Sequence, residues 1–418
     1  MRIHPLIFLM SRHISIHFNI ILHIDTIHFS DNIYNMLKRH IKKQIDSYIS
    51  GDKHKVFFIW GPRRSGKTTI LKDIGSELSL PVFNFDLLSD REIFVPERKR
   101  LKKIALTHKV ILIDEVQNYP ESTVALKILH DEFGVKIIAT GSSELRQKSA
   151  NFDTLTGRFT ETYCLPLSIK EIDVNSKVEE YSKDLLHKEL ADYLQIFGTY
   201  PEVYTSKILP ESEKIDLLQN ILDTYVLKDI INIYDLKNEK LAKDILTKIA
   251  LQIGSEVSIR ELANTLGANA STVSNYIEIF INNYILIPLP SFRTNIRKAV
   301  SENRKLFFYD LGIRNILVKD FRSLELRPDK GGVFENFIIS EAEKKRKNDR
   351  NKQTMYFYRE YGGKEVDLVL EDYKKNYKSI EIKSNDRGPI KDIFPLPHSF
   401  TVINKNNYFK EITGLFKL

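Results

Sequence analysis

The first part of the chain alternates short apolar runs with stretches of helical spacing. Val56–Trp60 and Val110–Ile113 are continuous apolar runs, and Val135–Ala139 is a third apolar run with Lys136 near its start, as expected for strands that are buried on both faces of a parallel sheet. Thr69–Leu78 follows the first run with a helical pattern. Strands that alternate with helices in this way predict an α/β fold built on a parallel sheet.

The rest of the chain shows two further patterns. Amphipathic runs from residue 169 to about 238 predict long helices, and residues 240–292 predict three short helices joined by glycine-containing turns. Near the carboxyl end, residues 365–371 and 379–383 alternate aliphatic and charged side chains. Because side chains along a strand point to opposite faces in turn, this period predicts two paired strands with one buried face.

Residues 1–35 differ from everything after them because they are apolar without a steady period. A membrane-spanning helix needs about 20 apolar residues, and Arg12 and Asp25 interrupt the segment. No small-residue cleavage site follows it, which argues against a signal peptide. We therefore expect an amino-terminal extension upstream of a translation start at Met36, no membrane contact and a cytoplasmic protein.

Composition narrows the class of protein only slightly. A chain of 418 residues is too long for one ordinary core, so several domains are expected. The one cysteine, Cys164, excludes an intramolecular disulfide and fits a reducing compartment. The formal net charge of +8 favours polyanionic partners, but over this length the bias is mild.

Residues 61–68 carry the G-x-x-x-x-G-K-[ST] pattern between a predicted strand and a predicted helix. The glycines let successive backbone N–H groups point at phosphate oxygens, and the following helix adds its positive end. Lys67 is expected to reach the β- and γ-phosphates of ATP, and the Thr68 hydroxyl to coordinate Mg²⁺. The predicted nucleotide-binding residues of this loop are Gly61, Pro62, Arg63, Arg64, Ser65, Gly66, Lys67, Thr68 and Thr69.

Two later segments complete the predicted nucleotide site. Asp114 and Glu115 follow the second apolar run, where Asp114 is expected to bind Mg²⁺ through water and Glu115 to orient and deprotonate the attacking water. Ser142 follows the third run and is expected to sense the γ-phosphate. Asn84 is either a coupling residue between ligand and Glu115 or an ordinary amide at a strand end.

These segments resemble the predicted archaeal and bacterial AAA+-type ATPases on the STAND-like side of that superfamily. The stretches GPRRSGKTT, ILIDEVQ, LTGRF and PLS-x-x-E carry the resemblance. It implies ATP hydrolysis and a nucleotide-contacting arginine, here Arg158, that acts in cis or on a neighbouring subunit. The alternative for Arg158 is an ordinary salt-bridging arginine beside a turn glycine.

The resemblance extends to a helical lid, marked by GTYPEVY, and a winged helix-turn-helix follows it. The predicted recognition helix either contacts DNA or packs against another protein surface. The basic stretches 96–103 and 343–352 are candidates for DNA contact or are solvated helix faces. The side chains that this recognition helix is predicted to present are Ser271, Thr272, Ser274, Asn275 and Tyr276.

The alternating strands near the carboxyl end place Asp367, Glu381 and Lys383 on one sheet face, with Glu335 on a helix upstream. This layout resembles the PD-(D/E)xK nuclease core, although Val366 stands where the motif has proline. The resemblance implies Mg²⁺ held by Asp367 and Glu381, with Lys383 as a catalytic residue. The alternative is a nuclease-like domain without cleavage activity.

We expect five regions in the chain, and an α/β fold class that joins a P-loop NTPase to a restriction-endonuclease-like domain. The leading hypothesis is an ATP-hydrolysing switch that acts on or near double-stranded DNA, alone, as a homo-oligomer or with a protein partner. The alternative is a slow regulatory NTPase or scaffold with an inactive nuclease-like domain. The expected regions are an extension (1–35), the AAA+ core (36–168), the helical lid (169–238), the winged helix-turn-helix (239–295) and the nuclease-like domain (296–418).

Overall fold

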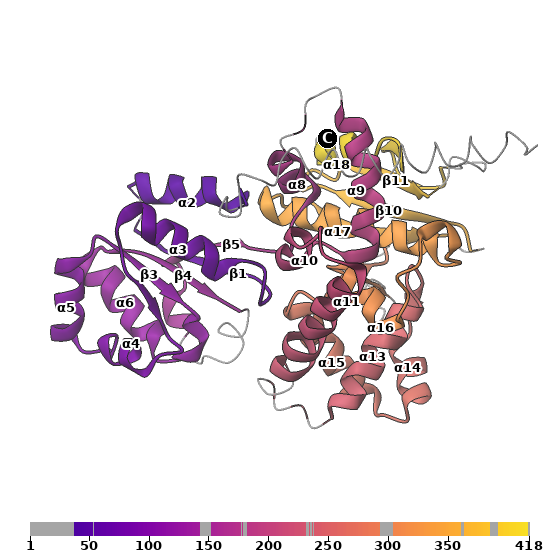
Figure 1. Cartoon of the computed structure of the whole chain (residues 1–418). Coiled ribbons are helices and arrows are strands. Elements are labelled where there is room, and N and C mark those ends of the chain that lie inside the picture. Colours follow the sequence, from indigo (N-terminus) through magenta and orange to yellow (C-terminus); the bar gives the residue numbers. More distant parts are fainter. Residues whose placement is uncertain are drawn as a thin grey trace, which may run out of the picture.

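The computed structural model describes residues 37–416, except 53, 143–151, 177, 179–181, 231–233, 235, 237, 293–303, 361–362 and 385–391. The expected extension and the Met36 start therefore lie outside the described residues. Figure 1 shows a smaller amino-terminal unit (indigo to purple) beside a larger body made by the rest of the chain. Among the described helices, none combines the length and apolar character needed to cross a membrane.

The amino-terminal unit is built on five parallel strands in the order β2-β3-β4-β1-β5, which confirms the predicted α/β fold with a parallel sheet. All three apolar runs are strands of this sheet. Because the strands are parallel, the segments that follow β1, β3 and β4 all leave the sheet at one edge. The strands are β1 (Val56–Trp60), β2 (Val82–Asn84), β3 (Val110–Asp114), β4 (Lys136–Gly141) and β5 (Phe159–Tyr163).

Helices cover both faces of this sheet. Ile59 of β1 packs with α2 and α3 in one core, and its neighbour Phe58 packs with α5 and α6 in another, since successive side chains alternate faces. The helical segments of this unit are α2 (Ile41–Ser50), α3 (Lys67–Leu78), α4 (Leu88–Ile93), α5 (Arg98–Thr107), α6 (Ser122–Phe133), η1 (Val116–Asn118) and η2 (Phe152–Leu155).

The middle of the chain is helical and ends in a small antiparallel sheet with the order β6-β8-β7. Its strand β8 pairs with both β6 and β7, so the expected boundary after residue 295 wrongly separates β8 from its sheet. The elements are α8 (Ile169–Asn175), α9 (Lys183–Phe197), α10 (Pro201–Thr205), α11 (Glu211–Asn220), the π-helix η4 (Ile221–Asp229), α13 (Glu239–Leu251), β6 (Glu256–Val257), α14 (Ile259–Leu266), α15 (Ala270–Asn282), β7 (Leu286–Pro290) and β8 (Arg304–Phe308).

The last part holds a four-stranded sheet in the order β12-β11-β10-β9, parallel only between β11 and β12. The predicted strand pair is confirmed, with Leu368 opposite Ile380. Val369, expected on the polar face, is buried, because Phe292 and Phe394 cover it in a separate small core. The elements are α16 (Leu311–Val318), η6 (Leu324–Leu326), α17 (Lys330–Asn348), β9 (Thr354–Arg359), β10 (Glu365–Glu371), β11 (Tyr377–Lys383), β12 (Ser399–Asn404) and α18 (Tyr408–Gly414).

Candidate functional site

The loop between β1 and α3 has the tight curvature that its glycines predict. Gly66 adopts a φ of 95°, in the left-handed region where a side chain is strained. Gly61 passes so close to the start of the segment after β5 that an added Cβ would lie 2.0 Å from the Cys164 carbonyl oxygen. Both positions therefore need glycine for the loop to close above the helix.

Lys67 lies in this loop with its side chain buried. Its Nζ donates to the carbonyl oxygens of Gly61 and Pro62 at 2.9 and 2.8 Å. Burial lowers the pKa of Lys67, while the nearby Glu115 and Cys164 oppose that shift. The ammonium is thus held at the phosphate loop by backbone oxygens, in the region where the sequence places it.

A cavity of about 700 Å³ opens beside the loop, a volume in the range of small-molecule sites. It is bounded by the loop with the start of α3, the segment before α2, the lid helix α10, and the segments that follow β2 and β3. Glu115 lines it, whereas Asp114 is buried below the surface. The lining residues are Leu37, Arg39, Arg63, Arg64, Gly66, Lys67, Thr68, Thr69, Ile70, Asp86, Glu115, Pro201, Glu202 and Thr205.

The ends of β3 and β4 meet next to this cavity. The Thr140 hydroxyl donates to the Asp114 carboxylate and fixes its position. Glu115 adopts a φ of 53°, a left-handed conformation that costs a non-glycine residue about 1–3 kcal/mol. Such strain is typical of functional positions, and it turns Glu115 towards the cavity while Asp114 stays in the strand.

Gln117 is a site residue that the sequence analysis missed. Its side-chain amide donates to Glu115 and its carbonyl oxygen accepts the Ser142 N–H at 3.2 Å. Ser142 is buried, and its hydroxyl is among the described buried polar atoms without a hydrogen-bond partner. The only sequence signal was the position of Gln117 two residues after Glu115.

Asn84 does not bond to Glu115 among the interactions of the described residues. Its side-chain oxygen accepts the Asp86 N–H at 2.9 Å, and its own N–H donates to Asp90. This geometry fits the prediction that Asn84 is an ordinary amide at a strand end. Asparagine side chains commonly close a turn by accepting the N–H two residues further on.

Arg158 lies at the opposite end of the sheet from the phosphate loop. Its carbonyl accepts the Val56 N–H, where β1 begins, and its Nε donates to both oxygens of Asp131 at 2.8 and 2.9 Å. The predicted contact with nucleotide in cis is therefore wrong, because the length of β1 separates Arg158 from the cavity. A role in trans stays a prediction.

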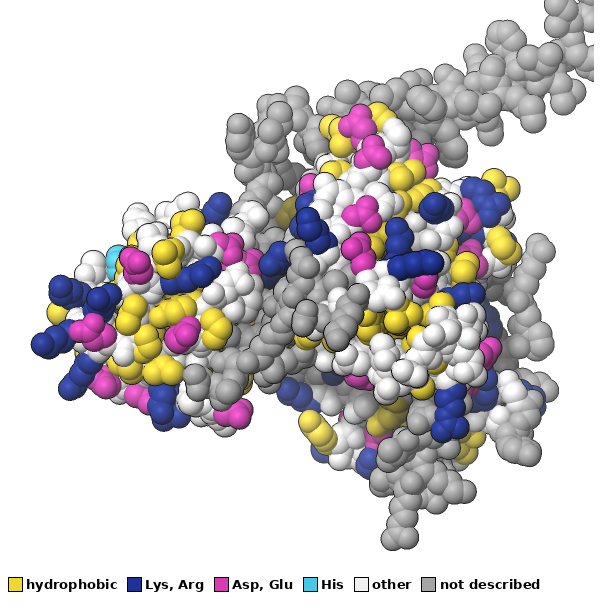
Figure 2. All heavy atoms as spheres, turned by 90° about the horizontal axis from the view of Figure 1, so that it is seen from below, with side chains coloured by type: hydrophobic (Ala, Val, Ile, Leu, Met, Phe, Trp, Pro, Cys, Tyr) yellow, Lys and Arg dark blue, Asp and Glu magenta, His cyan; other side chains and the backbone are white. Residues whose placement is uncertain are grey.

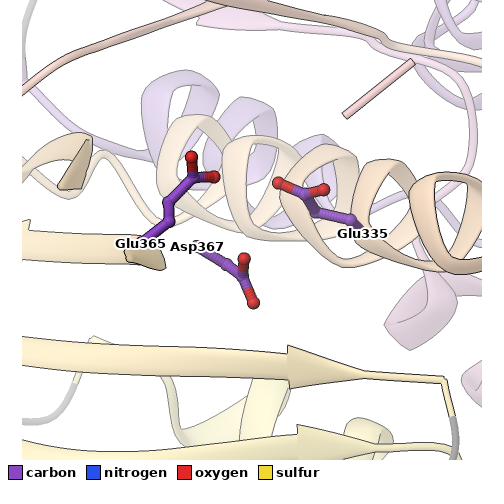
Figure 3. Close-up of side chains that lie close together, drawn as sticks. All are labelled: Glu335, Glu365 and Asp367. Atoms are coloured by element: carbon purple, nitrogen blue, oxygen red, sulfur yellow. The ribbon is translucent and has the colours of Figure 1, made fainter. Parts of the chain in front are cut away.

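A second cluster of carboxylates lies in the last part of the chain. Glu335 of α17 reaches towards Glu365 and Asp367 of β10 (Figure 3), and each offers an oxygen within 4.8 Å of the others. The Asp367 carboxylate also accepts the Ile382 N–H at 2.7 Å. Burial, together with the carboxylates of Glu335 and Glu381, raises the pKa of Asp367 to about 7.

Lys305 supplies positive charge to this cluster. It extends from β8 of the three-stranded sheet, is 2% exposed, and forms ion pairs with Glu335 at 2.8 Å and with Glu365. Burial opposes its charge, but the two glutamates outweigh this effect and raise the pKa of Lys305. An ammonium from another sheet thus offsets part of the negative charge of the three carboxylates in the cluster.

The predicted metal ligands are only partly brought together. Glu365 joins Asp367 and Glu335 in the described cluster, whereas Glu381 is ion-paired with Lys383. The predicted ligand set did not include Glu365, which lies with Asp367 and Glu335 in this cluster. Lys305 pairs with two of the three carboxylates, and Mg²⁺ binding by Asp367 and Glu381 stays a prediction.

Of the two basic stretches, only the first forms an exposed face. Figure 2 shows Lys and Arg side chains gathered at the outer end of the amino-terminal unit, where α5 lies. In the second stretch, Lys344 is 1% exposed and paired with Glu341, whereas Arg350 and Lys352 beyond the end of α17 are exposed, so the prediction of a solvated or DNA-facing surface is wrong for the buried part of the stretch alone. The exposed basic residues of α5 are Arg98, Lys99, Arg100, Lys102 and Lys103.

The predicted recognition helix is α15. Ser271 and Asn275 are exposed on it, but Tyr276 is buried and its hydroxyl donates to the Asn238 carbonyl. Tyr276 is therefore a core residue, and it was wrongly predicted as a surface contact.

The parallel sheet, the loop and the paired acids define an AAA-type P-loop domain. Residues 53–173 match the family model described as "AAA domain", which agrees with this architecture. Residues 187–324 and 330–401 match two models described as domains of unknown function, DUF8612 and DUF4143.

The chain has relatives in archaea and bacteria. It is 28% identical to MJ1544 of Methanocaldococcus jannaschii over 379 residues, which covers 84% of this chain and 82% of that protein. A Haemophilus influenzae protein is 26% identical over 61% of this chain and 67% of its own length; both relatives are described as uncharacterized. A solved structure of the Thermotoga maritima RuvB Holliday junction branch migration motor covers 60% of this chain and 89% of its own, at 18% identity. With a TM-score of 0.29, that likeness carries no argument.

Proposed function

We propose that this chain binds ATP with Mg²⁺ in the loop cavity and hydrolyses it. One observation carries the proposal: a single cavity brings together the phosphate loop, a strained glutamate and a lid helix. The backbone N–H groups at the start of α3 are free of helical partners and face bound phosphate oxygens. Lys67 adds a fixed positive charge beside them.

Mg²⁺ binding and activation of the attacking water fall to different residues of the site. The Thr68 hydroxyl and the Asp114 carboxylate are hard oxygen donors that suit Mg²⁺, which when bound neutralises phosphate charge. Glu115 orients the attacking water and accepts its proton, and Gln117 holds the Glu115 carboxylate in place. Ser142 lies beside Gln117 and links the γ-phosphate to this arrangement.

A phosphate-release assay with and without double-stranded DNA tests the proposal. We expect turnover that Lys67→Ala lowers at least about a hundredfold, and that Glu115→Gln lowers to a similar degree while ATP still binds. Lys188→Ala, at an exposed lysine on α9 away from the cavity and from the basic face of α5, is the matched control and keeps wild-type turnover. Turnover that survives Lys67→Ala would refute the site.

We further propose that hydrolysis drives a conformational switch near DNA. Arg64 of the loop bonds to Glu202 of α10 and to Asn220 at the end of α11, so nucleotide at the loop competes for a contact with the lid. The exposed basic face of α5 and a winged-helix reading of residues 239–308 support DNA as the polyanion. DNA affinity that falls with rising salt, and differs between ATP and ADP, is the expected result.

The second candidate is a regulatory NTPase or scaffold whose nuclease-like unit does not cleave. Lys305 favours it, because its ammonium already pairs with Glu335 and Glu365, two of the carboxylates that could otherwise bind a metal ion. We expect no Mg²⁺-dependent nicking of plasmid DNA by the wild-type chain. Nicking that disappears in Asp367→Ala and Lys383→Ala would instead support an active nuclease-like site.

A further inference from the structure

Arg39 lies just before α2 and beneath the phosphate loop. Its side chain is 6% exposed, and all three of its nitrogens donate within the chain. Nη1 donates to the Ser65 carbonyl at 2.6 Å, Nη2 to the Leu165 carbonyl at 2.5 Å, and Nε to Glu171 at 2.9 Å. Arg39 therefore joins the loop, the segment after β5 and the start of α8.

The bond to Ser65 fixes the direction of an amide that faces the ligand. In a trans peptide unit the C=O and the following N–H point in opposite directions. Because Arg39 holds the Ser65 oxygen, the Gly66 N–H of the same peptide points away from Arg39 Nη1. Gly66 and Arg39 both line the cavity beside the loop, and an added Cβ at Gly66 would lie 3.3 Å from Arg39 Nη1.

The other loop carbonyls are held in the same manner. Lys67 takes the oxygens of Gly61 and Pro62, and the Ser65 hydroxyl donates to Pro62 at 2.8 Å. The loop is therefore shaped by donors of its own chain before a ligand binds. Preorganised N–H donors bind an anion more tightly because they need no reorientation.

We propose that Arg39 is a positioning residue of the phosphate site, which presets the Gly66 N–H for a nucleotide phosphate by clamping the Ser65 carbonyl. The inference rests on the proposed nucleotide site and extends it. Arg39 acts through the loop, because one N–H of each of its three nitrogens is already donated to the chain, including the one that holds the Ser65 carbonyl.

Arg39→Met and Arg314→Met test this role as a matched pair. Arg314 is also a buried arginine that donates to a backbone carbonyl, that of Ala250, and pairs with a carboxylate, Asp329, but it lies in the helical unit. We expect both variants to melt at lower temperature. Only Arg39→Met should raise the Kd for ADP with Mg²⁺, by about tenfold to a hundredfold, which is the size of a lost charged hydrogen bond.

The measurement is calorimetric titration well below both melting temperatures, with steady-state kinetics beside it. KM should rise in Arg39→Met while kcat stays within about threefold, since Lys67 and Glu115 are untouched, and Arg39→Lys should recover part of the affinity. Equal Kd values in Arg39→Met and Arg314→Met would overturn the role of Arg39. A wild-type chain that binds neither ATP nor ADP would instead overturn the proposed function, and this inference with it.

Discussion

Gly61 is the residue at which the phosphate loop leaves β1 and passes against the exit of β5. We expect Gly61→Ala to lower ADP affinity at least tenfold, because the Cβ would overlap the Cys164 carbonyl and displace the loop. Titration calorimetry measures this effect. Gly134→Ala is the control: its added Cβ meets nothing within 4 Å and the residue lies outside the cavity lining, so affinity should not change. An unchanged Kd in Gly61→Ala would show that the close approach is dispensable.

Glu171 provides a pH-dependent contribution to stability. Burial raises the pKa of its carboxyl, but Arg39 and the N–H groups of Ser168 and His40 outweigh burial and hold it below the usual value. The stabilisation is therefore present above the unfolded pKa of about 4.3 and is lost as the pH falls through the lower folded value.

We expect Glu171→Gln to lower the free energy of unfolding at pH 7 by about 3–5 kcal/mol, because Arg39 loses its counter-charge. The variant should therefore unfold at a lower urea concentration than wild type. At pH 3 the gap in unfolding free energy should narrow, since the wild-type carboxylate then begins to protonate. Urea titrations at both pH values measure the gap. A gap that is equal at pH 7 and pH 3 would rule out the carboxylate as its source.

Local residue patterns were sufficient to predict the loop and the acids after β3, because each depends on a short run of sequence with its own flanking strand or helix. Arg39 and Gln117 escaped prediction for a different reason. Each has a partner that only the folded chain brings near: Glu171 for Arg39 and Ser142 for Gln117. A lone arginine before a helix carries no such signal.

At the scale of elements, the period-two pattern of β10 does not predict its contacts with distant elements such as β8. The alternation in β10 predicted Val366, Leu368 and Leu370 on one buried face, and all three are buried. A register shift between Val366 and Val369 breaks the alternation, so Val366 packs with Val369 in the small core, whereas Leu368 and Leu370 pack in the large one. The period-two pattern also could not show that β8, a strand of another sheet, sends Lys305 to Glu335 and Glu365. Covering elements from distant sequence change a solvent face into an interior one, as Phe292 also does.

Lys305→Met should therefore unmask the carboxylates of α17 and β10. We expect this variant to melt at lower temperature at pH 8, because like charges lose their internal cation, and Mn²⁺ to restore part of the loss. Thermal melts with and without Mn²⁺, in the absence of nucleotide, measure both effects. Glu335→Gln in the Lys305→Met background should reduce the response to Mn²⁺. A wild-type melting temperature that rises equally with Mn²⁺ would contradict the role of Lys305 as counter-ion.

At the scale of the whole molecule, α17 holds the lid segment to the carboxyl-terminal sheet. Lys344 donates to the Leu167 carbonyl at 3.0 Å and to the Thr199 hydroxyl at 2.9 Å. Glu341 of the same helix accepts the Ile169 N–H at 2.8 Å. The PLS-x-x-E and GTYPEVY stretches thus connect the nucleotide unit to the last part of the chain through buried polar bonds.

Glu202 is the charged lid residue through which a bound nucleotide is expected to act on this connection. It is a carboxylate in the cavity, held by Arg64, and it repels a polyphosphate. We expect Glu202→Gln to bind ATP about threefold to tenfold more tightly, with a smaller gain for ADP, since the repulsion grows with ligand charge and weakens with distance.

Titration at low and high salt measures the change for both nucleotides, and Glu211→Gln, on the exposed start of α11, controls for the loss of one negative charge. If ATP and ADP gain equally, Glu202 does not sense the terminal phosphate. A larger gain for ATP would mean that the lid helix and the third phosphate compete for Arg64. The same competition would then displace α10 whenever ATP replaces ADP. Through the bond between Thr199 and Lys344, the displacement would also act on α17.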